Sequence, residues 1–308
     1  MKSNIKRRSF LKTLLATPAL TTTGILLDLG PAKSQNKIPG PVGSNLKISL
    51  NAFSFNEPLR NKNMTLDDLL DFCALNNFDA VDLTGYYFPG YPNVPPDDYI
   101  YALKRKAFLL GLDISGTGVR NDFSNADENK RKEDITLVKK WIEVAQKLGA
   151  PVIRIFSGSQ IPPGYSWEQV MTWMIKDINE CVAYGRQHGV IVAVQNHNDF
   201  IKTADQAQKI IEAVNSDWFG LVLDIGSYRS GDPYKQIEQT AKYAVNWQLK
   251  ENMYINEAEV KTDLNKVIEL IKASGYRGYV PIETLGAGDP KIKVPLFLAE
   301  VRKAMERA

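Results

Sequence analysis

The sequence predicts an α/β fold, a single (β/α)8 TIM barrel preceded by an N-terminal export signal. From Leu46 to the C-terminus, short apolar runs alternate with longer segments in which apolar residues recur at helical spacing. Eight such units in roughly 260 residues suit the size and element count of a (β/α)8 barrel. Polar residues follow several apolar runs directly, as expected where the carboxyl ends of barrel strands surround an active site.

The predicted strands are the short apolar runs. They cover residues 46–52, 80–83, 112–116, 152–156, 190–194, 220–223, 243–249 and 279–283. The clearest predicted helices between them cover residues 65–76, 130–148, 167–188, 203–214 and 263–274.

A doubly wound parallel sheet is the alternative α/β architecture. It would need fewer strands and a glycine-rich first turn. The Gly116-Thr117-Gly118 stretch follows the third predicted strand and lacks the third glycine of a nucleotide-binding turn. The barrel is therefore the better interpretation.

The N-terminus has the features of a twin-arginine export signal. The basic stretch Lys6-Arg7-Arg8-Ser9-Phe10-Leu11-Lys12 precedes a mildly apolar run, and Ala32 and Ser34 suit a signal-peptidase site cleaved after Ser34. Pro18, Asp28 and several Thr interrupt the apolar run, which makes it poor for a permanent membrane span.

We therefore predict a periplasmic or otherwise exported protein that uses the twin-arginine export machinery. It would have no stable membrane span in the mature chain. The predicted organisation is a signal peptide over residues 1–34, a linker over 35–45 and the barrel over 46–308.

Charge argues against a nucleic-acid partner. The chain has 38 Lys and Arg against 35 Asp and Glu, but residues 1–34 hold six of these bases and one acid. The mature chain would carry 32 bases and 34 acids, a net charge of about −2, whereas nucleic-acid binding favours a basic surface.

Four polar stretches at predicted strand ends point to a site. They are Gln195-Asn196-His197, Leu223-Asp224, Gln248-Leu249-Lys250 and Ile282-Glu283. The pattern resembles the xylose isomerase-like TIM barrels, a superfamily of sugar and sugar-phosphate isomerases and epimerases that also includes endonuclease IV-type DNA repair enzymes. The resemblance covers residues 46–308, and two histidines are too few for the endonuclease branch.

The resemblance implies a divalent metal site that has changed here. Isomerase members typically hold the ion with Glu, Asp, His and Glu, in motifs like E-N-H, L-D, H-x-K-D and I-E. The four positions read Gln195, Asp224, Gln248 and Glu283, with two negative charges and no nitrogen base. We expect a degenerate site that binds a divalent cation (Mg, Mn or Ca) weakly or is empty.

The loss of the first Glu also changes the expected proton chemistry. In epimerases of this family the first and last Glu form the proton-transfer pair, and Gln195 cannot accept a proton. Glu283, His197 and Lys250 are the remaining catalytic candidates, because imidazole transfers protons near neutral pH and an ammonium can hold an enolate-like oxygen. Alternatively, His197 hydrogen-bonds a loop, and Lys250 only pairs with Asp224 or Glu283.

Other strand ends supply candidate substrate contacts. Tyr86 belongs to an aromatic loop that could stack on a sugar ring or pack on itself, and Arg154 could bind an anionic group or form a structural ion pair. The complete set of substrate-binding candidates is Asn51, Asp82, Tyr86, Arg154, Asn196 and Trp247.

The sequence therefore predicts an exported enzyme of the sugar isomerase, epimerase or lyase kind. It would abstract a proton next to a carbonyl in a sugar or an oxidised sugar, with a small-molecule carbohydrate as its partner. A carbohydrate-binding protein that lost the reaction is the alternative. Isomerase, epimerase and lyase activities, the sugar and the oligomeric state stay open.

Overall fold

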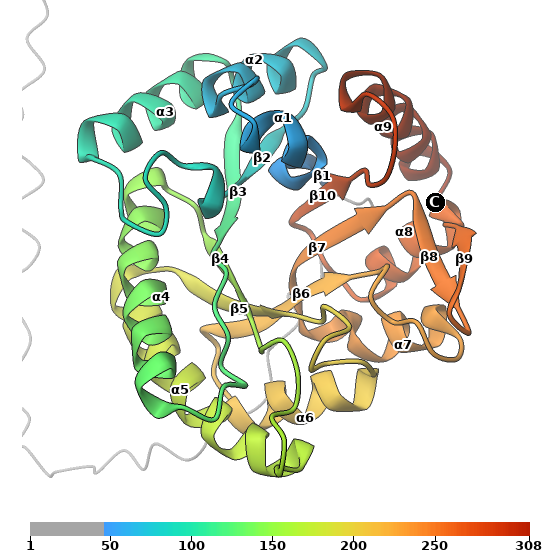
Figure 1. Cartoon of the computed structure of the whole chain (residues 1–308). Coiled ribbons are helices and arrows are strands. Elements are labelled where there is room, and N and C mark those ends of the chain that lie inside the picture. Colours follow the sequence, from blue (N-terminus) through green and yellow to red (C-terminus); the bar gives the residue numbers. More distant parts are fainter. Residues whose placement is uncertain (1–45) are drawn as a thin grey trace, which may run out of the picture. The chain divides into compact units, whose positions relative to one another are not determined.

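Eight parallel strands close into a barrel in the spatial order β1-β10-β7-β6-β5-β4-β3-β2 (Figure 1). The computed structural model describes residues 46–308. The barrel strands are β1 (Lys47–Asn51), β2 (Ala80–Thr84), β3 (Asp113–Gly118), β4 (Val152–Phe156), β5 (Ile191–Gln195), β6 (Phe219–Asp224), β7 (Ala244–Lys250) and β10 (Tyr279–Glu283).

Helices surround the barrel and cover the outer faces of its strands (Figure 1). They are α1 (Asn56–Arg60), α2 (Leu66–Leu75), α3 (Asp97–Leu109), α4 (Glu128–Leu148), α5 (Trp167–His188), α6 (Ala204–Val214), α7 (Pro233–Thr240), α8 (Leu264–Ala273) and α9 (Pro290–Arg307). The predicted fold class is confirmed, and the predicted segments 152–156, 279–283 and 167–188 coincide with β4, β10 and α5.

Local sequence explains where several helices begin and end. Thr65, Ser166 and Thr203 form capping boxes in which the side chain accepts a hydrogen bond from the third helical N–H. Gly149 and Gly189 end α4 and α5 in the left-handed conformation that glycine adopts without steric cost.

The interior face of the barrel changes from apolar to polar along the strands. Val152, Ala193 and Val222 form a small buried cluster inside the barrel. Because side chains alternate between the two faces of a strand, Arg154, Gln195 and Asp224 lie on the same interior face two residues further on. The barrel therefore has an apolar floor below a polar layer near its carboxyl end.

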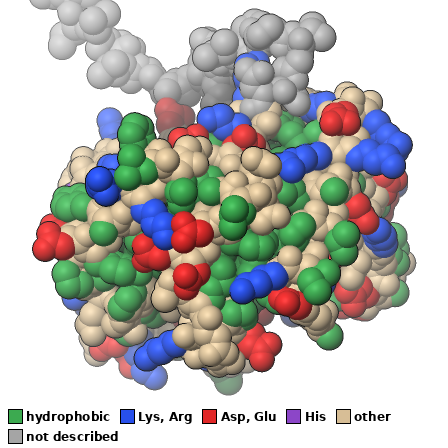
Figure 2. All heavy atoms as spheres, turned by 90° about the horizontal axis from the view of Figure 1, so that it is seen from above, with side chains coloured by type: hydrophobic (Ala, Val, Ile, Leu, Met, Phe, Trp, Pro, Cys, Tyr) green, Lys and Arg blue, Asp and Glu red, His purple; other side chains and the backbone are tan. Residues whose placement is uncertain are grey.

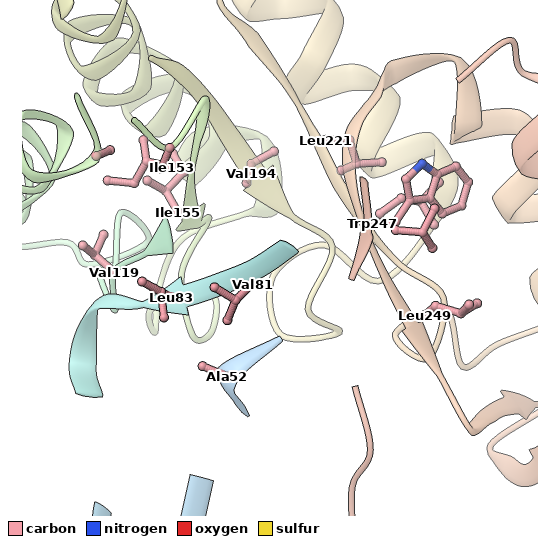
Figure 3. Packing of buried hydrophobic residues seen from close by; sticks show 14 of the residues in the cluster. Ala52, Val81, Leu83, Val119, Ile153, Ile155, Val194, Leu221, Trp247 and Leu249 are labelled. Carbon is pink, nitrogen blue, oxygen red and sulfur yellow. The ribbon is translucent and has the colours of Figure 1, made fainter. Parts of the chain in front are cut away.

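Alternation also decides the place of Trp247. Its neighbours Asn246 and Gln248 bond residues inside the barrel, so Trp247 faces outward and is fully buried against Tyr276. Figure 3 shows Trp247 and Leu249 on the same side of β7. This corrects the prediction that Trp247 lines the pocket.

The surface and the N-terminal region add two observations. On the face drawn in Figure 2, acidic and basic side chains are interspersed, with no large area of one sign.

Within residues 46–308, no helix has both the length and the apolar composition needed to cross a bilayer. The predicted export signal and linker lie outside the described residues.

A buried ion pair joins α4 to α5. Arg131 donates to Asp177 at 2.7 Å and to the carbonyl of Asn125 at 2.8 Å, and both charged side chains are about nine-tenths buried. We expect Arg131→Met to lower the free energy of unfolding by about 3–5 kcal/mol, because Asp177 would be left buried without a partner. Urea denaturation measures the loss. The double variant Arg131→Met/Asp177→Leu should recover most of it, and an equal loss in the double variant would contradict the ion-pair explanation.

Candidate active site

A cavity of about 610 Å³ opens at the carboxyl end of the barrel. Its wall includes the last residue of each of five barrel strands. Strand ends at this side of a TIM barrel surround its active site. These residues are Asn51, Phe156, Gln195, Lys250 and Glu283.

The ammonium of Lys250 connects two buried acids beside the cavity. Its Nζ lies 2.8 Å from Oδ2 of Asp224 and 3.3 Å from Oε1 of Glu283. The strand register produces this contact, since Lys250 is paired with Glu283 in the β7–β10 ladder. In the neighbouring ladder Asp224 is paired with Gln248, two residues before Lys250.

The three charged groups shift one another's pKa values. Burial alone would raise the pKa of Asp224, but the Lys250 ammonium outweighs burial and holds that pKa below its usual range. Burial raises the pKa of Glu283 despite the attraction of Lys250. Burial opposes the charge of Lys250, yet the two acids raise its pKa. Asp224 and Lys250 therefore form an ion pair, and Glu283 is the acid most ready to take a proton.

Two amides complete the polar layer. The Nε2 of Gln195 donates to Oδ2 of Asp224 at 2.8 Å and to Oε1 of Gln248 at 2.7 Å. The other oxygen of Asp224 accepts a hydrogen bond from the Gly226 N–H at 2.9 Å. Asp224 is fully buried and is separated from the cavity by the groups bonded to it.

These contacts do not fit a divalent ion at the four predicted positions. An amide nitrogen of Gln195 and the ammonium of Lys250 both point at the carboxylate oxygens that would ligate the ion. The neutral amide of Gln248 stands where the imidazole would be, and it already accepts a hydrogen bond from Gln195. Among residues 46–308 there is also no cluster of three His, Cys, Asp or Glu side chains arranged to hold a metal.

Four more predicted residues line the cavity. Tyr86 and Arg154 lie side by side, with Nη2 of Arg154 donating to the Tyr86 hydroxyl at 3.3 Å. Asn51 lines the cavity while its Oδ1 caps a short helix through the Phe53 N–H. His197 is half exposed at the cavity wall, and its Nδ1 lies 2.7 Å from Asp199.

Two other predicted residues lie outside the cavity wall. Both ends of the buried Asn196 amide bond the backbone of Asp224, so Asn196 positions Asp224 and does not face the cavity. Asp82 is buried near the cavity, where Asn246 donates to it at 3.4 Å, and burial raises its pKa to about 6. The placement of Asn196 corrects its substrate-contact prediction, and the contact of Asp82 with substrate stays a prediction.

Several cavity residues were missed because they belong to loops. Arg120 follows β3, and Arg229 follows β6 with its guanidinium 4.3 Å from the Tyr254 ring. Tyr254 and Glu259 come from a hairpin of β8 (Asn252–Ile255) and β9 (Ala258–Lys261), inserted after β7. The positive φ angles of its Asn256-Glu257 turn suit Asn more than Glu, which leaves only a weak sequence signal.

Comparison with known proteins identifies the family. The profile of the xylose isomerase-like TIM barrel matches residues 70–303. The chain belongs to this family. An inosose isomerase from Halalkalibacterium halodurans is 24% identical over 247 residues, which cover 73% of this chain and 84% of that protein.

Solved structures share the fold. A D-psicose 3-epimerase from Clostridium cellulolyticum H10, solved with D-tagatose, has a TM-score of 0.70 at 16% identity and covers 84% of this chain and 99% of its own. A zinc-bound IOLI protein has a TM-score of 0.68 at 19% identity and covers 84% of this chain and 96% of its own. At these identities, the likeness concerns the fold alone.

Removal of the Lys250 charge should reveal the repulsion between the two acids. We expect Lys250→Met to lower the free energy of unfolding by about 3–5 kcal/mol near neutral pH. Without the ammonium, burial and mutual repulsion raise the folded-state pKa of Asp224 and Glu283. A raised pKa costs stability as pH rises, so the loss should be larger at about pH 8 than at about pH 5.

Urea denaturation at both pH values measures this effect. The matched control is Lys261→Met, which removes an exposed pair with Glu300 and should change stability little. A loss in Lys250→Met that does not depend on pH would contradict the charge argument.

Metal uptake tests whether Gln195, Asp224, Gln248 and Glu283 can hold a divalent ion. After incubation with Mn²⁺ or Zn²⁺ and dialysis, we expect elemental mass spectrometry to find no stoichiometric metal in the wild-type protein. The double variant Gln195→Glu/Gln248→His presents three carboxylates and an imidazole and should retain about one ion per chain. Stoichiometric uptake by the wild-type protein would show that the amides do act as ligands.

Proposed function

We propose that the protein is a sugar isomerase-like or epimerase-like enzyme that abstracts a proton next to a carbonyl, without using a divalent ion. The observation that carries the proposal is the contact of Lys250 with Glu283 and Asp224 at the cavity wall. It places a carboxylate of raised pKa beside a permanent positive charge. Proton abstraction to give an enolate needs such a pair, a base and a group that holds the developing oxyanion.

In the proposed reaction, Glu283 takes the proton from the carbon next to the carbonyl. The C–H electron pair forms a carbon–carbon double bond, and the carbonyl oxygen becomes an oxyanion held by the Lys250 ammonium. Asp224 stays ionised and keeps Lys250 charged and in place. Return of the proton to the same carbon from the opposite face gives an epimer. Protonation of the former carbonyl carbon, with the neighbouring hydroxyl passing its proton to the oxyanion, gives an isomer. If the oxyanion instead re-forms the carbonyl and a substituent leaves the next carbon with its bonding electron pair, a lyase product results.

His197 is the proposed second proton carrier. Its contact with Asp199 fixes one ring nitrogen, and half of the side chain is open to solvent at the cavity wall. An imidazole can both accept and donate a proton.

The carbohydrate substrate class rests on the family and on the cavity. The relatives named above are an inosose isomerase and a D-psicose 3-epimerase. Tyr86 and Phe156 add aromatic surface to a mainly polar wall, a combination suited to sugar rings. Asn51 and Gln248 offer amide groups for hydroxyls.

Export belongs to the same proposal. The twin-arginine pattern over residues 6–12 and the suggested cleavage after Ser34 would deliver the enzyme to the periplasm. The substrate would then be a sugar or an oxidised sugar present outside the cytoplasm.

Hydrogen exchange tests the function directly. In D₂O, the wild-type protein should incorporate deuterium at a carbon next to the carbonyl of inosose or D-tagatose, measured by NMR. Glu283→Gln should slow exchange by about 10²–10⁴-fold, because the amide cannot accept the proton. The wild-type rate should rise with pH as Glu283 loses its proton, over a range above its ordinary value of 4.5.

The same substitution at an exposed position is the control. Glu306→Gln, near the end of α9, should leave exchange unchanged. If no ketose or oxidised sugar exchanges while sugars still bind, the protein is a carbohydrate-binding protein and the proposed reaction is wrong.

A further inference from the structure

Arg154 is a buried cation at the cavity wall that the proposed reaction does not use. It lies on β4, is 6% exposed and reaches the cavity from the interior face of the barrel. Gly118 makes room for it, since a Cβ at that position would lie 2.8 Å from both Nε and Nη2. The barrel thus holds the guanidinium in one place.

No carboxylate balances this charge at ion-pair distance. Within residues 46–308, Arg154 hydrogen-bonds only the Val119 carbonyl at 3.1 Å and the Tyr86 hydroxyl at 3.3 Å, and no acid lies within 4.0 Å. Arg131 is the contrasting case, because it is about as buried but pairs with Asp177 at 2.7 Å. Asp82 and Glu283 act on this charge only from beyond ion-pair distance, so guanidinium donors remain for an anionic ligand.

The surroundings of the guanidinium favour a planar anion. Its carbon lies 4.2 Å from the Phe156 ring centre and 5.8 Å from that of Tyr86. Two of its five N–H groups have a partner in the described residues, which leaves donors for a two-oxygen group. A carboxylate matches the fixed fork of a guanidinium with two parallel hydrogen bonds.

We propose that Arg154 forms an anion subsite that binds the carboxylate of an acidic sugar. The sugar part of this inference rests on the proposed function, because Arg154 and Glu283 line the same cavity. The substrate class is then a sugar acid whose reacting carbon lies at Glu283 and Lys250 and whose carboxylate lies at Arg154. Arg120 also lines the cavity and adds positive charge near this end.

Calorimetry with paired ligands tests the subsite. D-glucuronate, D-galacturonate and D-gluconate are compared with the corresponding neutral amides and with D-glucose 6-phosphate. The wild-type protein should bind at least one acid about 10-fold or more tighter than its amide. Arg154→Met should remove that preference, and Arg154→Lys should keep part of it.

Binding of D-glucose 6-phosphate distinguishes a carboxylate subsite from a phosphate subsite. Tighter binding of the sugar phosphate than of every sugar acid would overturn the carboxylate assignment. Equal binding of the sugar acids, their amides and the sugar phosphate by the wild-type protein would overturn the anion subsite altogether.

Thermal stability gives a readout that needs no ligand. Arg154→Met should lower the Tm much less than Arg131→Met, since no acid lies within 4.0 Å of Arg154 whereas Arg131 pairs with Asp177 at 2.7 Å. A fall with Arg154→Met as large as that with Arg131→Met would mean that Arg154 is a structural cation, against the proposal.

Hydrogen exchange keeps the two proposals separable. Acid-selective binding that depends on Arg154, without exchange in any sugar, would leave the subsite standing and refute the reaction. Exchange in a sugar acid that Arg154→Met leaves unchanged would support the reaction and refute the subsite.

Discussion

The candidate site depends on one buried cation, the Lys250 ammonium, held between two carboxylates. Asp224 and Glu283 come from the ends of different strands, and both are almost completely buried. Two acids so close together would not both ionise inside a protein without a positive charge beside them. Lys250 supplies that charge from within the chain, so the polar layer needs no external ion to balance Asp224.

The other contacts of Asp224 and Glu283 explain why one acid stays ionised and the other can change its protonation state. Asp224 accepts hydrogen bonds from Lys250, Gln195 and Gly226, and Asn196 holds its backbone on both sides. Glu283 has the Lys250 contact and an open side toward the cavity. One acid is therefore a fixed counter-charge, and the other is free to change its protonation state.

The sequence predicts the fold and the strand-end residues well, because both follow from periodicity. Gln195, Lys250 and Glu283 are the last residues of their strands, and they meet at the cavity as the barrel geometry requires. The error at Trp247 was avoidable, since a residue next to the inward-facing Gln248 must point outward. The places of Asn196 and Asp82 depend on partners in other strands, Asp224 and Asn246, which no local pattern reveals.

The β8–β9 hairpin contributes cavity residues from outside the eight barrel strands. A backbone hydrogen bond from Thr262 to Glu251 closes its base, and Met253 anchors it in the core. The Asn256-Glu257 turn lies at the far end, so changes in its length or composition would alter the cavity rim without moving Lys250. The hairpin residues of the rim thus belong to a different piece of the chain from the strand-end groups Lys250 and Glu283, and a change of rim shape would leave the register of those groups intact.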